Sequence, residues 1–369
     1  MPPVSVMIKP VSGSCNMKCD YCFYTDETRK RQQECHGIMS EQTLKNVIRR
    51  ALLPAEEGIS FLFQGGEPLL RGLPFYEKVL QYEAQYNKHH IAVSNAIQTN
   101  GYAINEEWCR FFAKNHFLVG LSVDGTKELH DAYRHTKSSG SSYERCMYAV
   151  KLLKQYGVEF NILTVVTGKT AGCIEEIYED YQKQEFRFQQ YIACLDPLYE
   201  SHGMQSYALS PGQYGSFLVR LFNCWYQDMK NNRQPYIRQF ENYIGILRGY
   251  LPESCEQRGT CSVQNVVEAD GSVYPCDFYM IDDYYLGNFN TDTLAVMNQR
   301  RDKTDFLSRS EKLPEECVSC PYFKLCRGGC QRNRDFLPTH NVYQNYLCEG
   351  YRFFFENCLD RLREIAGNL

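Results

Sequence analysis

Strand-like segments alternate with amphipathic helical segments from Val4 to Met229, and this alternation restricts the possible folds more than any other feature of the chain. Because each helix returns the chain to the same end of the sheet, such segments form parallel sheets. We therefore predict an α/β fold, either an incomplete (β/α)8 barrel of six units or an open doubly wound sheet. The predicted strands are Val4–Lys9, Ile59–Gln64, Ala92–Thr99, Phe117–Val123, Glu159–Val166 and Arg187–Ala193. The predicted helices are Ser40–Leu53, Leu73–Tyr86, Glu106–Lys114, Ser142–Tyr156, Cys173–Lys183 and Ser210–Met229.

Both folds place the active site at the C-terminal ends of the strands. The informative motifs follow the strands, at residues 15–22, 64–68, 98–101, 122–125 and 194–197. We expect them to gather at one edge of the sheet.

After Met229 the sequence becomes richer in cysteine and in turn residues, which predicts a second module. We place the domains at residues 1–235 and 236–369, with a linking helix at Tyr243–Leu251 and a last helix at Tyr351–Ile365.

Charge and hydropathy restrict the partners and the compartment. A net charge of -4 gives no basic surface for nucleic acid, and no apolar segment is long enough to span a membrane. The N-terminus lacks the features of a signal peptide, so we predict a cytoplasmic protein. Because cytosolic thiols stay reduced, its 18 cysteines favour metal or cluster ligation over disulfides.

Cys15, Cys19 and Cys22 form a C-x3-C-x2-C motif directly after the first predicted strand. A four-iron cluster takes four ligands. Three thiols on one loop would leave one iron open to a substrate or cofactor.

Eight further cysteines follow residue 253 and suffice for two four-thiolate sites, which spacing alone leaves open to iron–sulfur clusters or zinc. They are Cys255, Cys261, Cys276, Cys317, Cys320, Cys326, Cys330 and Cys348. We expect the other seven cysteines to be small buried hydrophobic residues. These are Cys35, Cys109, Cys146, Cys173, Cys194, Cys224 and Cys358.

Gly65, Gly66 and Glu67 follow the second predicted strand. Backbone without side chains allows close approach, with N–H groups free for a carboxylate, and Glu67 can accept from an ammonium group. An ordinary Gly-Gly turn with a solvated Glu67 is the alternative. Ser122 and Asp124 follow the fourth strand and either bind ribose hydroxyls or form an Asp-Gly turn.

These motifs resemble those of a known enzyme family. The cysteine motif with Tyr21 before its last cysteine resembles the signature of radical S-adenosylmethionine (SAM) enzymes, and residues 65–67 resemble their methionine-binding motif. The eight-cysteine module resembles the SPASM domain. Residues 8–10, 63–68, 194–200 and 274–279 resemble anaerobic sulfatase-maturating enzymes, which oxidise a cysteine or serine of a sulfatase to formylglycine.

The resemblance implies a partial (β/α)6 barrel followed by a SPASM domain with two auxiliary clusters. It implies that SAM contacts Tyr21, Gly65, Gly66, Glu67, Ser122, Arg134 and Leu195, to which we add Asp124. It also implies three [4Fe-4S] clusters. Their ligands would be Cys15, Cys19 and Cys22 for the SAM-binding cluster, Cys255, Cys261, Cys276 and Cys330 for one auxiliary cluster, and Cys317, Cys320, Cys326 and Cys348 for the other.

Asp277 follows the predicted cluster ligand Cys276. The resemblance implies that Asp277 is the general base that takes a proton from the oxidised residue. Without the resemblance, Asp277 would be interpreted as an ordinary turn residue after Pro275. Gln64 is expected to orient the target side chain.

The predicted partners are an unfolded or nascent sulfatase polypeptide and an electron donor such as flavodoxin or ferredoxin, and the predicted enzyme is a monomer. Two alternatives stay open. One is another SPASM-type peptide maturase that forms thioether or carbon–carbon crosslinks, although the chain begins its first strand at Val4 without the N-terminal recognition domain that such enzymes often carry. The other is a non-catalytic zinc-binding interaction protein.

Overall fold

The computed structural model describes residues 4–138 and 140–368. It contains two compact units, each built from several stretches of the chain. The first comprises Met1–Ser122, Arg134–Phe160 and Val263–Phe306, and the second Val123–Tyr133, Asn161–Ser262 and Leu307–Leu369. These units are defined by which residues pack together, not by the order of the sequence. The division into modules at residues 235 and 236 stays a prediction.

The first unit is organised around a sheet with the strand order β12-β11-β10-β1-β3-β4-β5. Strands β10, β1, β3, β4 and β5 run parallel, and β11 and β12 pair antiparallel at one edge. The bounds are β1 (Val4–Ile8), β3 (Gly58–Phe63), β4 (Ala92–Thr99), β5 (Leu118–Ser122), β10 (Asn265–Val267), β11 (Ser272–Tyr274) and β12 (Gly287–Asn288). Two short strands, β2 (Met17–Cys19) and β6 (Arg134–Thr136), form a separate antiparallel pair.

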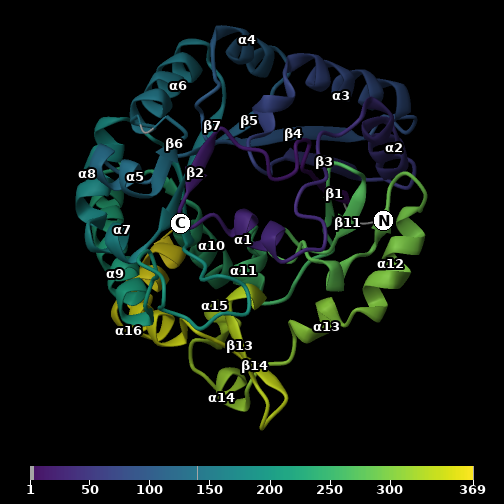
Figure 1. Ribbon diagram of the computed structural model, residues 1–369. Helices are drawn as coiled ribbons and strands as arrows, with labels where there is room; N and C mark the ends of the chain where they lie inside the picture. The colour runs from purple at the N-terminus through teal and green to yellow at the C-terminus, as the bar shows by residue number, and fades with distance from the viewer. Residues whose placement is uncertain (1–3, 139, 369) are drawn as a thin grey trace. The chain divides into compact units, whose positions relative to one another are not determined.

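The first four predicted strands are confirmed within one residue at each end. They form strands because their apolar side chains fill the core, where Val6, Ile8 and Phe63 are fully buried. Amphipathic helices lie outside these strands in Figure 1. They are α2 (Glu41–Leu52), α3 (Leu73–Tyr86), α4 (Glu106–Lys114) and α6 (Tyr143–Gln155). The unit also contains α1 (Phe23–Arg29), η1 (Pro68–Arg71), η2 (Asp282–Tyr284) and α12 (Leu294–Lys303).

The second unit contains the parallel strands β7 (Phe160–Val166), β8 (Phe188–Ala193) and β9 (Tyr236–Ile237). Its longest helices are α9 (Pro211–Lys230) and α16 (Cys348–Asn368), which pack against each other. The hydroxyl of Ser210 caps α9 and Pro211 occupies its first turn, as predicted. The other elements are α5 (Lys127–Tyr133), α7 (Gly168–Gly172), α8 (Ile174–Lys183), α10 (Arg238–Leu247), α11 (Cys255–Arg258), α14 (Glu315–Val318), α15 (Phe323–Cys326), η3 (Gln331–Asn333), β13 (Arg334–Leu337) and β14 (Val342–Asn345), while α13 (Phe306–Arg309) begins in the first unit.

Two predictions about the C-terminal half need correction. The linking helix, predicted at Tyr243–Leu251, is α10 at Arg238–Leu247, because the chain turns at Gly249 with a positive φ of 92°. Strands β10, β11 and β12 were not predicted, and β10 extends the parallel sheet beside β1. Among the described residues, no helix is both long and apolar enough to cross a membrane.

Candidate active site

The three N-terminal cysteines lie on one short loop after β1. Cys19 ends β2, and Cys22 is the residue before α1, with its N–H 3.2 Å from the carbonyl oxygen of Cys19. Burial, with some contribution from the charges of Glu67 and Cys22, raises the pKa of Cys15 to about 11. Three thiols on one loop fit a cluster held by three protein ligands, and binding would have to displace their protons.

Side chains from other strands donate hydrogen bonds to two of these sulfurs. Arg134 lies opposite Cys19 in the β2–β6 register, with Nη1 3.8 Å from the Cys19 Sγ. The Arg134 guanidinium lies 5.5 Å from the ring centroid of Tyr21. Nδ2 of Asn100, at the end of β4, lies 3.7 Å from the Cys15 Sγ. The structure therefore brings Tyr21 and Arg134, both predicted SAM contacts, to the cysteine loop.

Gly66 is required by the cysteine loop itself. A Cβ atom on Gly66 would lie 1.9 Å from the carbonyl oxygen of Ser14, and Gly65 has a φ of +141°, which favours glycine. The N–H of Gly66 donates to the Ser12 carbonyl at 2.9 Å, and that of Glu67 to the Ser14 carbonyl at 2.8 Å. The expectation that the Gly66 N–H is free for a ligand was wrong, because this N–H and that of Glu67 hold the cysteine loop in place.

Glu67 is fully buried, so the alternative of a solvated glutamate is wrong. Its Oε1 accepts from the Leu69 N–H at 3.0 Å and from the Thr99 hydroxyl at 2.8 Å, and its Oε2 from the Asn100 N–H at 2.9 Å. Burial raises its pKa to about 7, against the lowering effect of these donors. Glu67 therefore links the turn after β3 to the end of β4, and its contact with a SAM ammonium group stays a prediction.

The remaining predicted SAM contacts are divided between the two units. Ser122 ends β5 in the first unit. In the second unit, Leu195 follows β8, and Asp124 is buried with its Oδ1 2.9 Å from the N–H of Val165 on β7. Asp124 thus has a structural contact, and its binding of ribose stays a prediction.

Asp277 is held by two side chains at the strand ends of the first unit. Lys9, the residue after β1, forms an ion pair with Oδ1, and Gln64, the residue after β3, donates from Nε2 to Oδ2 at 2.9 Å. Lys9 is fully buried and Asp277 is 7 % exposed. The structure brings Gln64 and Asp277 together across 213 positions of sequence. The role of Lys9 was missed, and its only sequence signal is a charged residue at the end of a buried strand.

A second buried ion pair is connected to Lys9 through Tyr24. Arg31 Nη1 donates to Glu268 Oε2 at 2.7 Å, and the Tyr24 hydroxyl donates to the same oxygen. The Lys9 ammonium lies 4.5 Å from the centroid of the Tyr24 ring, within the range of a cation–π contact. Burial, together with the charge of Glu268, raises the pKa of Tyr24 far above its usual value. Tyr24 is therefore a neutral phenol in the core.

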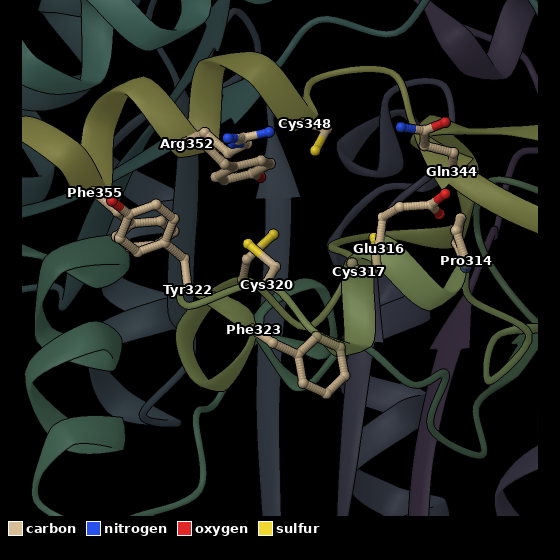
Figure 2. Close-up of a pocket in the computed structure, with 13 residues that line it drawn as sticks. Pro314, Glu316, Cys317, Cys320, Tyr322, Phe323, Gln344, Cys348, Arg352 and Phe355 are labelled. Carbon is tan, nitrogen blue, oxygen red and sulfur yellow. The ribbon is translucent and has the colours of Figure 1, made fainter.

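Four cysteines in the second unit surround a cavity of about 100 Å³ (Figure 2). Cys317 lies in α14, Cys326 ends α15, Cys348 begins α16, and Cys320 lies between α14 and α15. In Figure 2 the Cys348 thiol points from α16 toward the side of the cavity on which Cys320 lies, and the Tyr322 ring lies beside Phe355. Burial first, and then the charges of the other three thiols, raise the pKa of Cys326 to about 12. A cavity of this size among four thiols fits a group of several atoms; among the described residues, no set of three or more His, Cys, Asp or Glu side chains is placed to hold a single metal ion.

Cys255, Cys261 and Cys330 form another group in the second unit. Burial and the charges of Cys255 and Cys261 raise the pKa of Cys330 well above its usual value. Cys276, the fourth predicted ligand, lies in the first unit beside Asp277. Among the seven remaining cysteines, Cys109, Cys146 and Cys358 are buried as predicted and Cys173, Cys194 and Cys224 partly so, whereas Cys35 is exposed because it lies in a surface loop.

Two family models match the chain. The model of the radical SAM superfamily matches residues 10–181, and that of an iron-sulfur cluster-binding domain, SPASM, matches residues 255–321. The cysteine loop and the turn after β3 lie in the first match, and Cys276 and Asp277 in the second.

Relatives of known type align along all or nearly all of the chain. A cysteine-type anaerobic sulfatase-maturating enzyme of Clostridium perfringens is 42% identical over 369 residues, with 100% of both chains covered. A serine-type enzyme of Bacteroides thetaiotaomicron is 30% identical, with 96% of this chain and 89% of that protein covered. A solved structure of the enzyme anSMEcpe with bound AdoMet and the Cp18Cys peptide matches with a TM-score of 0.94 at 42% identity, covering 100% of this chain and 99% of that chain.

These matches confirm the predicted fold class, a radical SAM α/β fold followed by a SPASM domain. This chain therefore belongs to the family of anaerobic sulfatase-maturating enzymes within the radical SAM superfamily.

Proposed function

We propose that this enzyme oxidises a cysteine side chain of a sulfatase polypeptide to Cα-formylglycine. The observation that carries the proposal is the Asp277 carboxylate, which Lys9 and Gln64 hold beside the predicted cluster ligand Cys276. The preference for cysteine is supported by relatives of the cysteine type at 42% identity, against 30% for the serine-type enzyme described above.

The chain supplies three groups of thiols for [4Fe-4S] clusters. Cys15, Cys19 and Cys22 would hold the SAM-binding cluster, and the two auxiliary clusters would take Cys255, Cys261, Cys276 and Cys330, and Cys317, Cys320, Cys326 and Cys348. When bound, SAM and the clusters supply a 5′-deoxyadenosyl radical that abstracts a Cβ hydrogen, and an acceptor for the remaining electron. SAM is expected to contact Tyr21, Gly65, Gly66, Glu67, Ser122, Asp124, Arg134 and Leu195.

Asp277 is the proton acceptor in this proposal. Loss of a Cβ hydrogen atom and one electron from cysteine gives a thioaldehyde only if the thiol also loses its proton. Water then hydrolyses the thioaldehyde to the aldehyde of formylglycine and releases hydrogen sulfide. The Asp277 carboxylate accepts that proton, and positioned bases of this kind contribute roughly 10²–10⁴ in rate. Lys9 stabilises the ionised carboxylate, and Gln64 fixes its second oxygen, so that the acceptor is oriented before the substrate arrives.

The wider setting follows from the same proposal. The substrate is an unfolded or nascent polypeptide, because the target cysteine must reach a buried carboxylate. A flavodoxin or ferredoxin supplies electrons to this cytoplasmic enzyme, which acts as a monomer without membrane or nucleic-acid partners. The state of the substrate, the electron donor, the compartment and the oligomeric state are part of the proposal and do not follow from family membership alone.

A peptide assay tests the proposal. Anaerobically reconstituted enzyme is incubated with SAM, a reductant and a peptide that contains Cys-x-Pro-x-Arg, with the matched serine peptide as the comparison. Mass spectrometry is expected to find an aldehyde at the cysteine, formed faster than at the serine. A crosslinked peptide would assign the chain to the other class of SPASM maturases, and 5′-deoxyadenosine without any peptide product would also refute the proposal.

A further inference from the structure

Asn100 contacts the cysteine loop from the end of β4, and the proposed reaction gives it no role. Its Nδ2 donates to the Asn16 Oδ1 at 2.8 Å and to the Cys15 Sγ at 3.7 Å. The residue is 8 % exposed, so little water competes for these contacts. Asn100 donates to Cys15 from outside the cysteine loop, while the loop itself supplies the Met17 N–H at 3.4 Å.

The orientation of this amide is fixed by its other hydrogen bonds. The Asn100 Oδ1 accepts from the Tyr102 N–H at 3.0 Å, which requires Nδ2 to face the cysteine loop. Its backbone N–H donates to Glu67 at 2.9 Å, and its carbonyl oxygen accepts from the Cys146 thiol at 3.0 Å. The backbone and the side-chain oxygen of Asn100 are therefore both hydrogen-bonded, and its Nδ2 group keeps a fixed orientation toward Cys15.

We propose that Asn100 is a positioning residue that raises the reduction potential of the cluster held by Cys15, Cys19 and Cys22. The inference rests on the proposed function, because it assigns that cluster to these thiols. Hydrogen bonds to cluster sulfurs raise the reduction potential, since donors stabilise the more negative, reduced state. The N–H group of Asn100 supplies such a donor, and it simultaneously fixes the loop through Asn16.

Two substitutions separate the donor from the packing. Asn100→Leu keeps a side chain of similar size and removes the donor, so the midpoint potential of the cluster is expected to become more negative. Asn100→Asp keeps the shape but replaces the donor with an acceptor that can carry negative charge, so the shift is expected to be larger in the same direction. If the leucine variant fails to assemble its cluster, the aspartate variant carries the test.

Asn95→Leu is the matched control. Asn95 lies on β4, the strand that Asn100 follows, is 9 % exposed, and donates to the Glu83 Oε2 at 3.0 Å rather than to a cysteine. Its replacement removes a buried amide of the same kind from β4. The midpoint potential of the cluster is expected to stay unchanged in this variant.

The experiment is an anaerobic redox titration of the reconstituted full-length enzyme, followed by electron paramagnetic resonance. The signal followed is the one that changes when SAM is added, which separates this cluster from the auxiliary ones. A negative shift in the two Asn100 variants and none in Asn95→Leu supports the inference. An unchanged midpoint in Asn100→Leu or Asn100→Asp, or an equal shift in Asn95→Leu, refutes it while the proposed function stands. If the unsubstituted enzyme has no SAM-responsive signal, the proposed function itself is refuted.

Discussion

Lys9 and Asp277 form a buried ion pair although 268 positions separate them in the sequence. The pair exists because β10 lies parallel to β1, with the Lys9 N–H bonded to the Val267 carbonyl at 2.8 Å, and β11 then leads back to Cys276 and Asp277. The proposed base is therefore attached to the same sheet as the cysteine loop. An ammonium group and an amide hold it, and the ammonium group also lies over the ring of the neutral phenol Tyr24.

The first prediction concerns the charge of Lys9. Lys9→Met removes the ammonium but keeps the length of the side chain. Breaking a buried pair in this way costs about 3–5 kcal/mol of unfolding free energy, because the Asp277 carboxylate is left without its cationic partner. Formylglycine formation should fall by about 10²–10⁴ while 5′-deoxyadenosine still forms.

Lys78→Met is the control for that measurement, because Lys78 pairs with Glu41 at the surface, with the two side chains 43% and 56% exposed. Exposed pairs contribute little, so this variant should behave like the parent. Peptide product and 5′-deoxyadenosine are quantified together by mass spectrometry. A Lys9→Met enzyme with the parent ratio of the two products would show that Lys9 does not support the base.

The second prediction concerns Glu67. In Glu67→Gln one end of the side chain becomes an NH2 group, which must face either the Asn100 N–H or the Leu69 N–H, so a donor meets a donor. The free energy of unfolding should fall by about 1–3 kcal/mol, measured by urea titration. Glu83→Gln is the control: Glu83 accepts from Asn95 through one oxygen, which a glutamine can replace. Equal losses of unfolding free energy in the two variants would contradict the conclusion that Glu67 links the turn after β3 to the end of β4.

The third prediction concerns pH. His202 bridges Asp196 and Asp335, with Nδ1 and Nε2 each 3.0 Å from a carboxylate oxygen, and its ring stacks on Tyr346. The hydrogen bond to Asp196, together with the charge of Asp335, raises the pKa of His202 above its usual 6.5. A raised pKa means that the folded state binds the proton more tightly. The stabilisation is therefore complete below pH 6.5 and disappears as the pH rises through the folded pKa.

His202→Asn should accordingly lower the unfolding free energy by about 1–2 kcal/mol at about pH 6, and by less at about pH 8. His135→Asn, which removes an exposed histidine beside Asp20, serves as the control and should have little effect at either pH. Urea titrations at both pH values give the comparison. A loss in His202→Asn that does not depend on pH would contradict the ionic bridge.

The fourth prediction concerns metal content. Three four-iron clusters require about twelve irons per chain, and Cys320→Ala should leave about eight, because it removes one ligand of the cavity in Figure 2. Cys358→Ala removes a buried thiol in α16 outside that cavity and should retain all the iron. Iron and zinc are measured on the same samples. Stoichiometric zinc in place of iron would contradict the cluster assignment.

The sequence predicted the six strands because each is a short, partly apolar segment bounded by turn residues, and α9 because Ser210 and Pro211 mark its start. It did not predict β10, β11 or β12, whose two or three residues are too short to show a period. The contacts of Lys9 and Asn100 were missed for a different reason, since both join segments that lie far apart in the sequence. The sequence indicated correctly that Gly66 allows a close approach, but the group that approaches it is the cysteine loop rather than a ligand.

Asp277→Asn tests the central claim most directly. The variant enzyme is given SAM, a reductant and a Cys-x-Pro-x-Arg peptide that carries deuterium at the cysteine Cβ. Because the substitution removes the proton acceptor and leaves the cysteine loop intact, deuterium should still enter 5′-deoxyadenosine, while formylglycine falls by about 10²–10⁴ relative to the parent. An Asp277→Asn enzyme that makes formylglycine at the parent rate would contradict the account.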